Sequence, residues 1–274
     1  MLRRIHLRSH SEIAKIQKAG LILAEIFEDM RHFIRPGLST LEINDRCERI
    51  IRSHGGSCPC INYGDPPYPA ATCISLNETI VHGIPRANCI LHEGDIVTVD
   101  VVAELDGYLA DACRTYAVGQ ISAEAKLLIE DTEASFWQGL EQAKVGARVG
   151  DISSAIGNFA EGKGYGVIRE MCGHGIGTSM HEAPDVPNYG KAGHGPRLAE
   201  GMVFCIEPMI ALGSRQIVLQ EDGWGCDMAD GQYSAHYENT VLITEQGPSI
   251  LTMTASEIEA YRERYPFLAP PFIA

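Results

Sequence analysis

The sequence predicts an α+β fold built from two similar halves, and three observations support this. Two helix signals are followed by strand-like segments in the first part of the chain, and the same order returns in the second part. Equivalent residues of the two parts lie 109 positions apart, namely Gly37 and Gly146, Glu42 and Asp151, and Gly55 and Gly164. No Pro-, Ser- or Gly-rich linker separates the parts. We therefore expect one domain over residues 1–274 with a shared cleft, halves at about 9–120 and 121–250, and a C-terminal tail at 255–274.

The first half begins with two capped helices. Ser9 and Glu12 form a capping-box pattern, and the helix that follows is expected to end at Pro36-Gly37. A second box, Ser39 with Glu42, starts a shorter helix that ends at 54–56. The elements expected next are a loop at 57–70 and two strands at about 96–102 and 108–118, joined by a turn at 106–107.

The second half repeats this order. A helix is predicted from about 122 to 144 with a break at Gly146, and another from Asp151 to Gly164. Strand-like stretches follow at 203–210 and 236–244, and they are expected to form the second β-hairpin.

Composition excludes several classes of protein. The 22 Lys and Arg residues against 36 Asp and Glu give a net charge of −14, which argues against stable nucleic-acid binding. No apolar run is long enough to span a membrane, and segment 1–6 lacks the apolar stretch of a signal peptide. Nine cysteines without the density of a disulfide scaffold indicate reduced thiols. We expect a cytoplasmic protein without membrane contact, whose acidity reflects either solubility or carboxylates grouped around metal ions.

Acidic residues occur where a buried charge would be costly. Asp100 interrupts an apolar strand, and a tight hairpin would return Asp111 beside it. Two facing carboxylates repel unless a cation lies between them, although a single strand Asp is about as often an edge residue in water. In the second half, Glu207 and Glu238 flank apolar stretches, and His174 lies between glycines that permit close approach of a ligand. Two Asp, two Glu and one His suit two divalent ions a few ångströms apart.

The order Asp100, Asp111, His174, Glu207, Glu238 resembles the ligand set of the methionine aminopeptidases, over nearly the whole chain. The spacings agree: 11 residues between the Asp pair, 7 from His174 to His181, and 31 between the Glu pair. The resemblance includes three motifs, Val81-His82-Gly83-Ile84-Pro85, Gly173-His174-Gly175-Ile176-Gly177 and Ile206-Glu207-Pro208-Met209. The 31-residue spacing leaves no room for the helical insertion of the type II enzymes, and no zinc-finger extension is present, so the chain is similar to the short bacterial type I form.

The resemblance implies a pita-bread fold, in which two pseudo-symmetric halves surround a curved antiparallel sheet and a central dimetal cleft. It also implies removal of the initiator methionine from nascent chains whose second residue is small. Asp111 and Glu238 would bridge both metals, His174 and Glu207 would complete one site, and Asp100 the other. A metal-bridged hydroxide would attack the scissile carbonyl with Glu207 as general base, aided by His181 at the carbonyl oxygen and His82 at the scissile amide.

The methionine pocket implied by the resemblance combines aromatic and sulfur-containing side chains, which suit a thioether. Its residues, besides His82 and His181, are Cys60, Tyr63, Tyr68, Cys73, Met180, Met209 and Trp224. For the cysteines, ordinary core packing is the alternative. A monovalent cation is implied near Asn77 and Ser234. The divalent ions are Co, Mn, Fe, Zn or Ni, because Asp, Glu and His accept all of these.

Several departures from the family pattern bear on metal affinity, substrate contacts and partners. Ala112-Cys113 follow Asp111 at positions where the family commonly has hydroxyl residues, and Val102 lies where the family often has a Thr. We therefore expect fewer hydrogen bonds to the metal ligands. Met180 lies where a well-known bacterial form has Phe. Segment 212–230 carries one basic and four acidic residues, whereas a basic loop there docks some relatives on ribosomal RNA. We expect a monomer that acts on nascent N-termini and meets the ribosome transiently, by a docking mode that the sequence leaves open.

Two alternatives stay open. X-Pro aminopeptidases of the same fold share the ligand set but usually carry an extra N-terminal domain, which the residues before Ser9 do not supply. A metal-free binding protein on this fold would have lost ligands, whereas all five are present here. Cleavage of Met-Ala but not Arg-Pro peptides, together with the metal content, discriminates among the three.

Overall fold

The computed structural model describes residues 4–273, so residues 1–3 of the segment assessed as a signal peptide lie outside the described part. Its helices are α1 (His10–Phe33), α2 (Thr40–Ser53), α3 (Ala123–Glu141), α4 (Val149–Gly162) and α5 (Ala255–Arg264). The first four confirm the predicted helices, with ends shifted by a few residues. Helix α5 lies in the segment expected to be a tail. Among the described residues, no helix combines the length and apolar character needed to cross a membrane.

Helix starts are fixed by reciprocal hydrogen bonds of the capping-box type. The backbone N–H of Ser39 donates to the Glu42 carboxylate (2.8 Å), and the Glu42 N–H donates to the Ser39 hydroxyl (3.2 Å). Thr254 and Glu257 make the same pair of bonds at the start of α5 (2.8 and 3.3 Å). Helix α5 therefore carried a recognisable start signal, which the sequence analysis overlooked.

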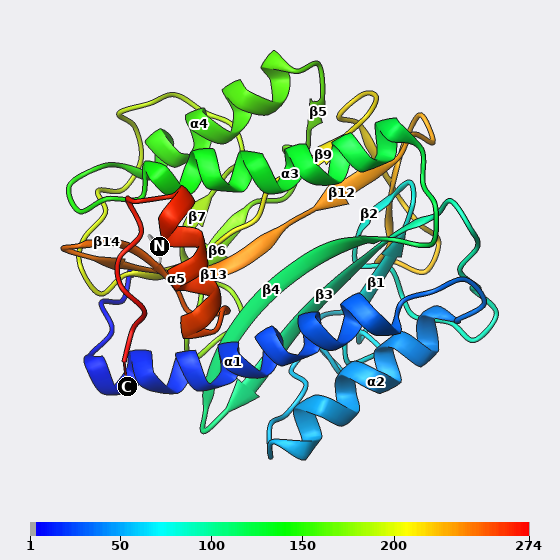
Figure 1. The fold of residues 1–274 in the computed structure, drawn as a ribbon, viewed down its shortest axis with the longest axis horizontal. Coiled ribbons are helices and arrows are strands. Elements are labelled where there is room, and N and C mark those ends of the chain that lie inside the picture. Colours follow the sequence, from blue (N-terminus) through cyan, green and yellow to red (C-terminus); the bar gives the residue numbers. More distant parts are fainter. Residues whose placement is uncertain (1–3, 274) are drawn as a thin grey trace.

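One eight-stranded sheet runs across both halves (Figure 1). Its strands are β1 (Cys73–Leu76), β3 (Ile96–Leu105), β4 (Tyr108–Ala117), β6 (Gly173–Gly175), β7 (Glu182–Val186), β8 (Val203–Ile206), β13 (Glu238–Thr244) and β14 (Gly247–Ile250). The order is β1-β3-β4-β13-β8-β6-β7 with β14 beside β13, and every pairing is antiparallel. Two three-stranded sheets complete the fold, formed by β2 (Thr79–Val81), β10 (Ile217–Leu219) and β11 (Cys226–Met228), and by β5 (Gly166–Val167), β9 (Met209–Ala211) and β12 (Ser234–His236).

Helices α1 and α2 lie along one edge of the molecule and α3 and α4 along the other, and both α1 and α3 contact β4 (Figure 1). Strand β4 shows which face they cover. Arg114 stacks on the Phe27 ring of α1 at 4.9 Å, and the Tyr116 hydroxyl donates to the Phe27 carbonyl at 3.0 Å. Because side chains alternate along a strand, Asp111 points to the opposite face, away from α1.

The second hairpin was predicted wrongly in its details. Stretch 203–210 is two strands, β8 and β9, which belong to different sheets and are separated by Glu207-Pro208. Pro208 has no N–H, so it cannot continue the ladder of β8. Stretch 236–244 also covers two strands, since β12 ends at His236 and β13 begins at Glu238. Tyr237 lies between them, and its N–H donates to the Pro208 carbonyl at 3.2 Å. Strands β8 and β13 still pair, but long segments connect them rather than a tight turn.

Candidate metal centre

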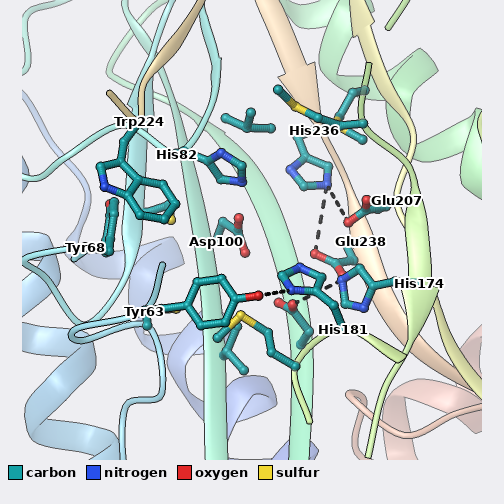
Figure 2. A pocket seen from close by; sticks show the side chains of 18 of the residues that line it. Tyr63, Tyr68, His82, Asp100, His174, His181, Glu207, Trp224, His236 and Glu238 are labelled. Carbon is teal, nitrogen blue, oxygen red and sulfur yellow. Dashed lines mark hydrogen bonds and ion pairs between the residues drawn. The ribbon is translucent and has the colours of Figure 1, made fainter. Parts of the chain in front are cut away.

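A cavity of about 240 Å³ opens on the face of the sheet opposite to α1, and all fourteen residues proposed for the site line it (Figure 2). They are Cys60, Tyr63, Tyr68, Cys73, His82, Asp100, Asp111, His174, Met180, His181, Glu207, Met209, Trp224 and Glu238. Five further residues complete the wall, namely Val81, Val102, Met171, Cys172 and His236. The structure therefore brings the proposed residues together, while their roles stay predictions.

The hairpin register places Asp100 and Asp111 on one face of the sheet. Asp100 pairs with Cys113, and Asp111 pairs with Val102, so the two carboxylates are diagonal neighbours. Burial raises the pKa of Asp100 to about 7. Burial and then the Asp100 charge raise the pKa of Asp111 well above its ordinary value. In the absence of a cation, these two carboxyls favour their protonated forms.

Glu207 and Glu238 approach from the second half. Glu238 begins β13 opposite Cys113 of β4, and this pairing joins the halves at the site. Glu207 follows β8, and the Asn188 amide fixes its backbone by donating to the Glu207 carbonyl at 2.9 Å. Burial and then the Asp100 charge raise the pKa of Glu207 to about 8. Burial, followed by the charges of the other three carboxylates, raises the pKa of Glu238 well above its ordinary value.

His174 presents a defined nitrogen to these carboxylates. Its Nδ1 lies 3.1 Å from the Gly175 carbonyl, which accepts hydrogen bonds but cannot donate them. The proton of neutral His174 is therefore assigned to Nδ1, and the Nε2 lone pair points to the site. Nε2 lies 3.8 Å from Oδ2 of Asp111, too far for a hydrogen bond and suitable for two ligands of one ion.

The donor set fits divalent cations. Oδ1 of Asp111 and Oε1 of Glu238 are buried without a hydrogen-bond partner, which is costly for a carboxylate unless a cation binds it. Ligand atoms of Asp111, His174, Cys205 and Glu238 lie within 4.8 Å of one another, and so do those of Glu207, His236 and Glu238. Four converging carboxylates in a buried site would repel each other strongly when all are ionised. Divalent ions would remove this repulsion.

Two members of these groups were missed at the sequence level. His236 precedes Glu238 by two residues and points its ring toward Glu207 and Glu238 (Figure 2). Cys205 precedes Glu207 by two residues, and its thiol lies 3.8 Å from the Thr240 hydroxyl. Both lie two positions from a carboxylate on an extended segment, a spacing that puts side chains on the same face and that could have identified them.

His82 and His181 also line the cavity, beside the carboxylates (Figure 2). His82 follows β2 and has a φ of +58°, in a region that non-glycine residues adopt rarely. Burial, and then His181, lower the pKa of His82 to about 4, so its imidazole is neutral at physiological pH. The Tyr63 hydroxyl lies 2.7 Å from Nδ1 of His181.

Replacing His181 is expected to separate its role from that of Tyr63. His181→Ala should lower kcat by about 10²–10³-fold if the ring donates to a developing oxyanion. Tyr63→Phe removes only the 2.7 Å hydrogen bond to Nδ1, so we expect a loss of about tenfold or less. Steady-state kinetics on a methionyl peptide, with melting temperatures as the folding control, measure both. Equal losses in the two variants would contradict the assignment of the oxyanion contact to His181.

The proposed methionine pocket has an aromatic wall. The Tyr68 and Trp224 rings meet edge to face with centroids 5.2 Å apart, and the Trp224 indole N–H donates to the Pro66 carbonyl at 3.0 Å. A Cβ on Gly64 would approach the Trp224 ring to 2.5 Å, so glycine is needed where the 57–70 loop crosses the indole. The Tyr68 hydroxyl donates to the Gly83 carbonyl at 2.9 Å and thereby ties this wall to His82.

Asn77 and Ser234 are also neighbours. The N–H and the hydroxyl of Ser234 both donate to the Asn77 carbonyl, at 3.0 and 3.2 Å. Asn77 has a φ of +54°, which turns its carbonyl toward Ser234. Both hydrogen bonds join segments that are 157 positions apart, and the monovalent cation stays a prediction.

Comparisons with known proteins agree with this geometry. The model of metallopeptidase family M24 matches residues 14–245. Methionine aminopeptidase of Clostridium acetobutylicum is 44% identical over 91% of this chain and 99% of its own length. The crystal structure of methionine aminopeptidase from Thermotoga maritima is 39% identical with a TM-score of 0.89, over 92% of this chain and all of that chain. Prolidase from Pyrococcus furiosus is 26% identical with a TM-score of 0.74, over 92% of this chain but only 66% of that one. These neighbours confirm the expected α+β pita-bread fold.

Proposed function

Because the chain belongs to metallopeptidase family M24, we propose that it is a methionine aminopeptidase that removes the N-terminal methionine of nascent chains whose second residue is small. One observation carries the proposal. Three buried carboxylates, the half-buried Asp100 and a histidine converge on one side of a cavity whose opposite wall is aromatic and sulfur-rich. The first group of side chains suits metal-assisted hydrolysis, and the second suits a thioether.

In the proposed mechanism, Asp111 and Glu238 would be ligands shared by the two divalent ions, His174 and Glu207 would complete one site, and Asp100 would complete the other. The bound ions would supply Lewis acidity and lower the pKa of a water molecule. Glu207 would accept the proton of that water, because its side chain lines the cavity beside the other proposed ligands.

The two histidines of the substrate side have separate tasks. If the Tyr63 hydroxyl donates to Nδ1 of His181, the imidazole proton is on Nε2 and is available to the carbonyl oxygen of the scissile bond. His82 is neutral, so it acts as a hydrogen-bonding group at the scissile amide rather than as a charge. The backbone at His82 is fixed by β2 and by the Tyr68 bond to Gly83.

X-Pro cleavage is the weaker candidate for this chain. The prolidase and X-Pro aminopeptidase neighbours are about one quarter identical, and this chain matches 66% or less of their length. A metal-free binding role is also disfavoured, because buried carboxylate oxygens without hydrogen-bond partners are costly in a protein that never binds a cation.

Several finer properties belong to the same proposal. We place the protein in the cytoplasm, a location that the low density of cysteines along the chain supports. We expect a monomer that contacts the ribosome transiently. Segment 212–230 is acidic, and Val218 and Leu219 of its strand β10 are exposed apolar residues. Both features favour a docking mode other than a basic loop that binds RNA. The divalent ions would be Co, Mn, Fe, Zn or Ni, and a monovalent cation would bind near Asn77 and Ser234.

The proposal is tested with short peptides and a metal series. We expect release of methionine from Met-Ala and Met-Pro peptides, but no cleavage of Arg-Pro or N-acetylated Met-Ala peptides. Metal-free protein should be inactive, and one or more of Co, Mn, Fe, Zn and Ni should restore turnover. Failure to release methionine with every ion, or preferential cleavage of Arg-Pro, would overturn the proposed function.

A further inference from the structure

We propose that His236 is an additional metal ligand, binding through Nε2 the ion that Glu207 and Glu238 share. This inference rests on the proposed dimetal centre and adds a sixth side chain to the five proposed ligands. It starts from a buried imidazole that the proposed mechanism leaves without a role.

The position of His236 is fixed by its backbone. Its N–H donates to the Thr115 hydroxyl at 3.1 Å, and the same hydroxyl donates to its carbonyl at 2.9 Å. Strand β12 also pairs His236 with Met209 of β9. The residue is 2% exposed, so the ring cannot turn out into water without moving these strands.

The ring itself has no hydrogen-bond partner. Both Nδ1 and Nε2 are buried without one, and such groups are rare in folded proteins unless an ion or water binds them. Nε2 lies 3.9 Å from Oε2 of Glu207 and 3.9 Å from Oε2 of Glu238, as the dashed lines in Figure 2 mark. These separations exceed a hydrogen bond, yet the nitrogen faces two carboxylates at once.

An ion between the three groups accounts for this spacing. Nitrogen and oxygen ligands lie about 2.0–2.2 Å from a transition-metal ion, so two ligands of one ion are separated by at most about 4.4 Å. The 3.9 Å distances fall within that limit, and the ligand atoms of Glu207, His236 and Glu238 all lie within 4.8 Å of one another. A neutral imidazole nitrogen is also a common ligand of such ions.

The proposal has a chemical consequence for metal choice. A site built from carboxylates and one histidine accepts hard ions such as Mn²⁺ readily, whereas a second imidazole favours Co²⁺, Ni²⁺ and Zn²⁺. His236 would therefore shift the preference of the shared site toward nitrogen-binding ions.

The test uses full-length protein, stripped of metal and titrated with Co²⁺. X-ray absorption of the wild-type protein with two Co²⁺ bound should show, on average, about one imidazole per ion, from His174 and His236 together. Calorimetric titration of His236→Ala and His236→Gln should show affinity for one of the two ions lowered by about tenfold or more, with the imidazole signal halved.

The two variants distinguish a ligand from a hydrogen-bond donor. Glutamine keeps an N–H donor close to the position of Nε2 but is a poor ligand, so restoration of affinity in His236→Gln alone would overturn the proposal. An imidazole count of one half per Co²⁺ in the wild type would overturn it without reference to any variant. Wild-type protein that binds no Co²⁺ would instead refute the dimetal function, whereas two tightly bound ions in wild type and both variants would refute only the ligand role of His236.

Discussion

Glu207→Gln is expected to lower kcat by about 10³-fold, within the range found for removal of a general base, while KM changes little. Glutamine has nearly the volume of glutamate but cannot accept the proton of the attacking water. The backbone at this position is held by Asn188 and by Pro208 on the next residue, so we expect the variant to stay folded. The measurement is steady-state kinetics on a methionyl peptide with saturating metal.

A surface glutamate supplies the matched control for that variant. Glu48→Gln removes one carboxylate from an exposed i,i+4 pair with Arg52 on α2, and we expect unchanged kinetics. Elemental analysis of both variants separates loss of the base from loss of a ligand. A Glu207→Gln enzyme with wild-type kcat would exclude Glu207 from both roles.

Metal removal is expected to abolish turnover and to destabilise the protein in a pH-dependent way. The pKa values of Asp100 and Glu207, about 7 and about 8, are raised above their ordinary values in the metal-free fold. The fold therefore favours their protonated forms. The stability that this gives is fully present below about pH 4 and is lost as the pH rises through 7 to 8. The metal-free protein should melt at a lower temperature near pH 8 than near pH 5.

Added metal should reverse this trend, because the ions bind the ionised carboxylates. An ion at 100 times its Kd stabilises the fold by about 2.7 kcal/mol, which corresponds to a rise in Tm of about 5–10 °C. We expect the rise to be largest near pH 8 and small near pH 5, where protons compete for the ligands. Carboxyls with a lowered pKa, such as Asp151 and Asp222, titrate below this window and do not mask the effect. Thermal melts with chelator and with metal across this pH range measure it, and a metal-induced rise that is independent of pH would contradict the proton competition.

Local signals in the sequence predicted much of the fold. The capping boxes of α1 and α2 and the turn at Asp106-Gly107 each depend on residues within a few positions of one another, and the structure confirms the elements they predict. The break at Glu207-Pro208 was missed, although Pro208 is a local signal for it. The assignment of β8 and β9 to different sheets is long-range, because the two strands pair with different partners.

The candidate site was likewise identified in part from the sequence and missed in part. Family resemblance placed fourteen residues in what proves to be one cavity. It did not identify His236, whose approach to Glu207 depends on the pairing of β12 with β9. The Tyr63–His181 hydrogen bond joins residues 118 positions apart, and no periodicity or spacing in the sequence indicates such a contact.

The proposed ligands come from both halves of the chain, and this affects how fast the ions can exchange. The first half supplies Asp100 and Asp111, and the second half supplies His174, Glu207 and Glu238. Each ion would therefore bind ligands of both halves and hold the halves together. Loosening one half alone would leave each ion held by at least one ligand of the other half. For an ion to dissociate, the ligands of both halves would have to separate from it together, which requires a rare, large-scale opening of the structure. We therefore expect metal release to be slow. The ion found in purified protein should then be the metal that was abundant when the chain folded.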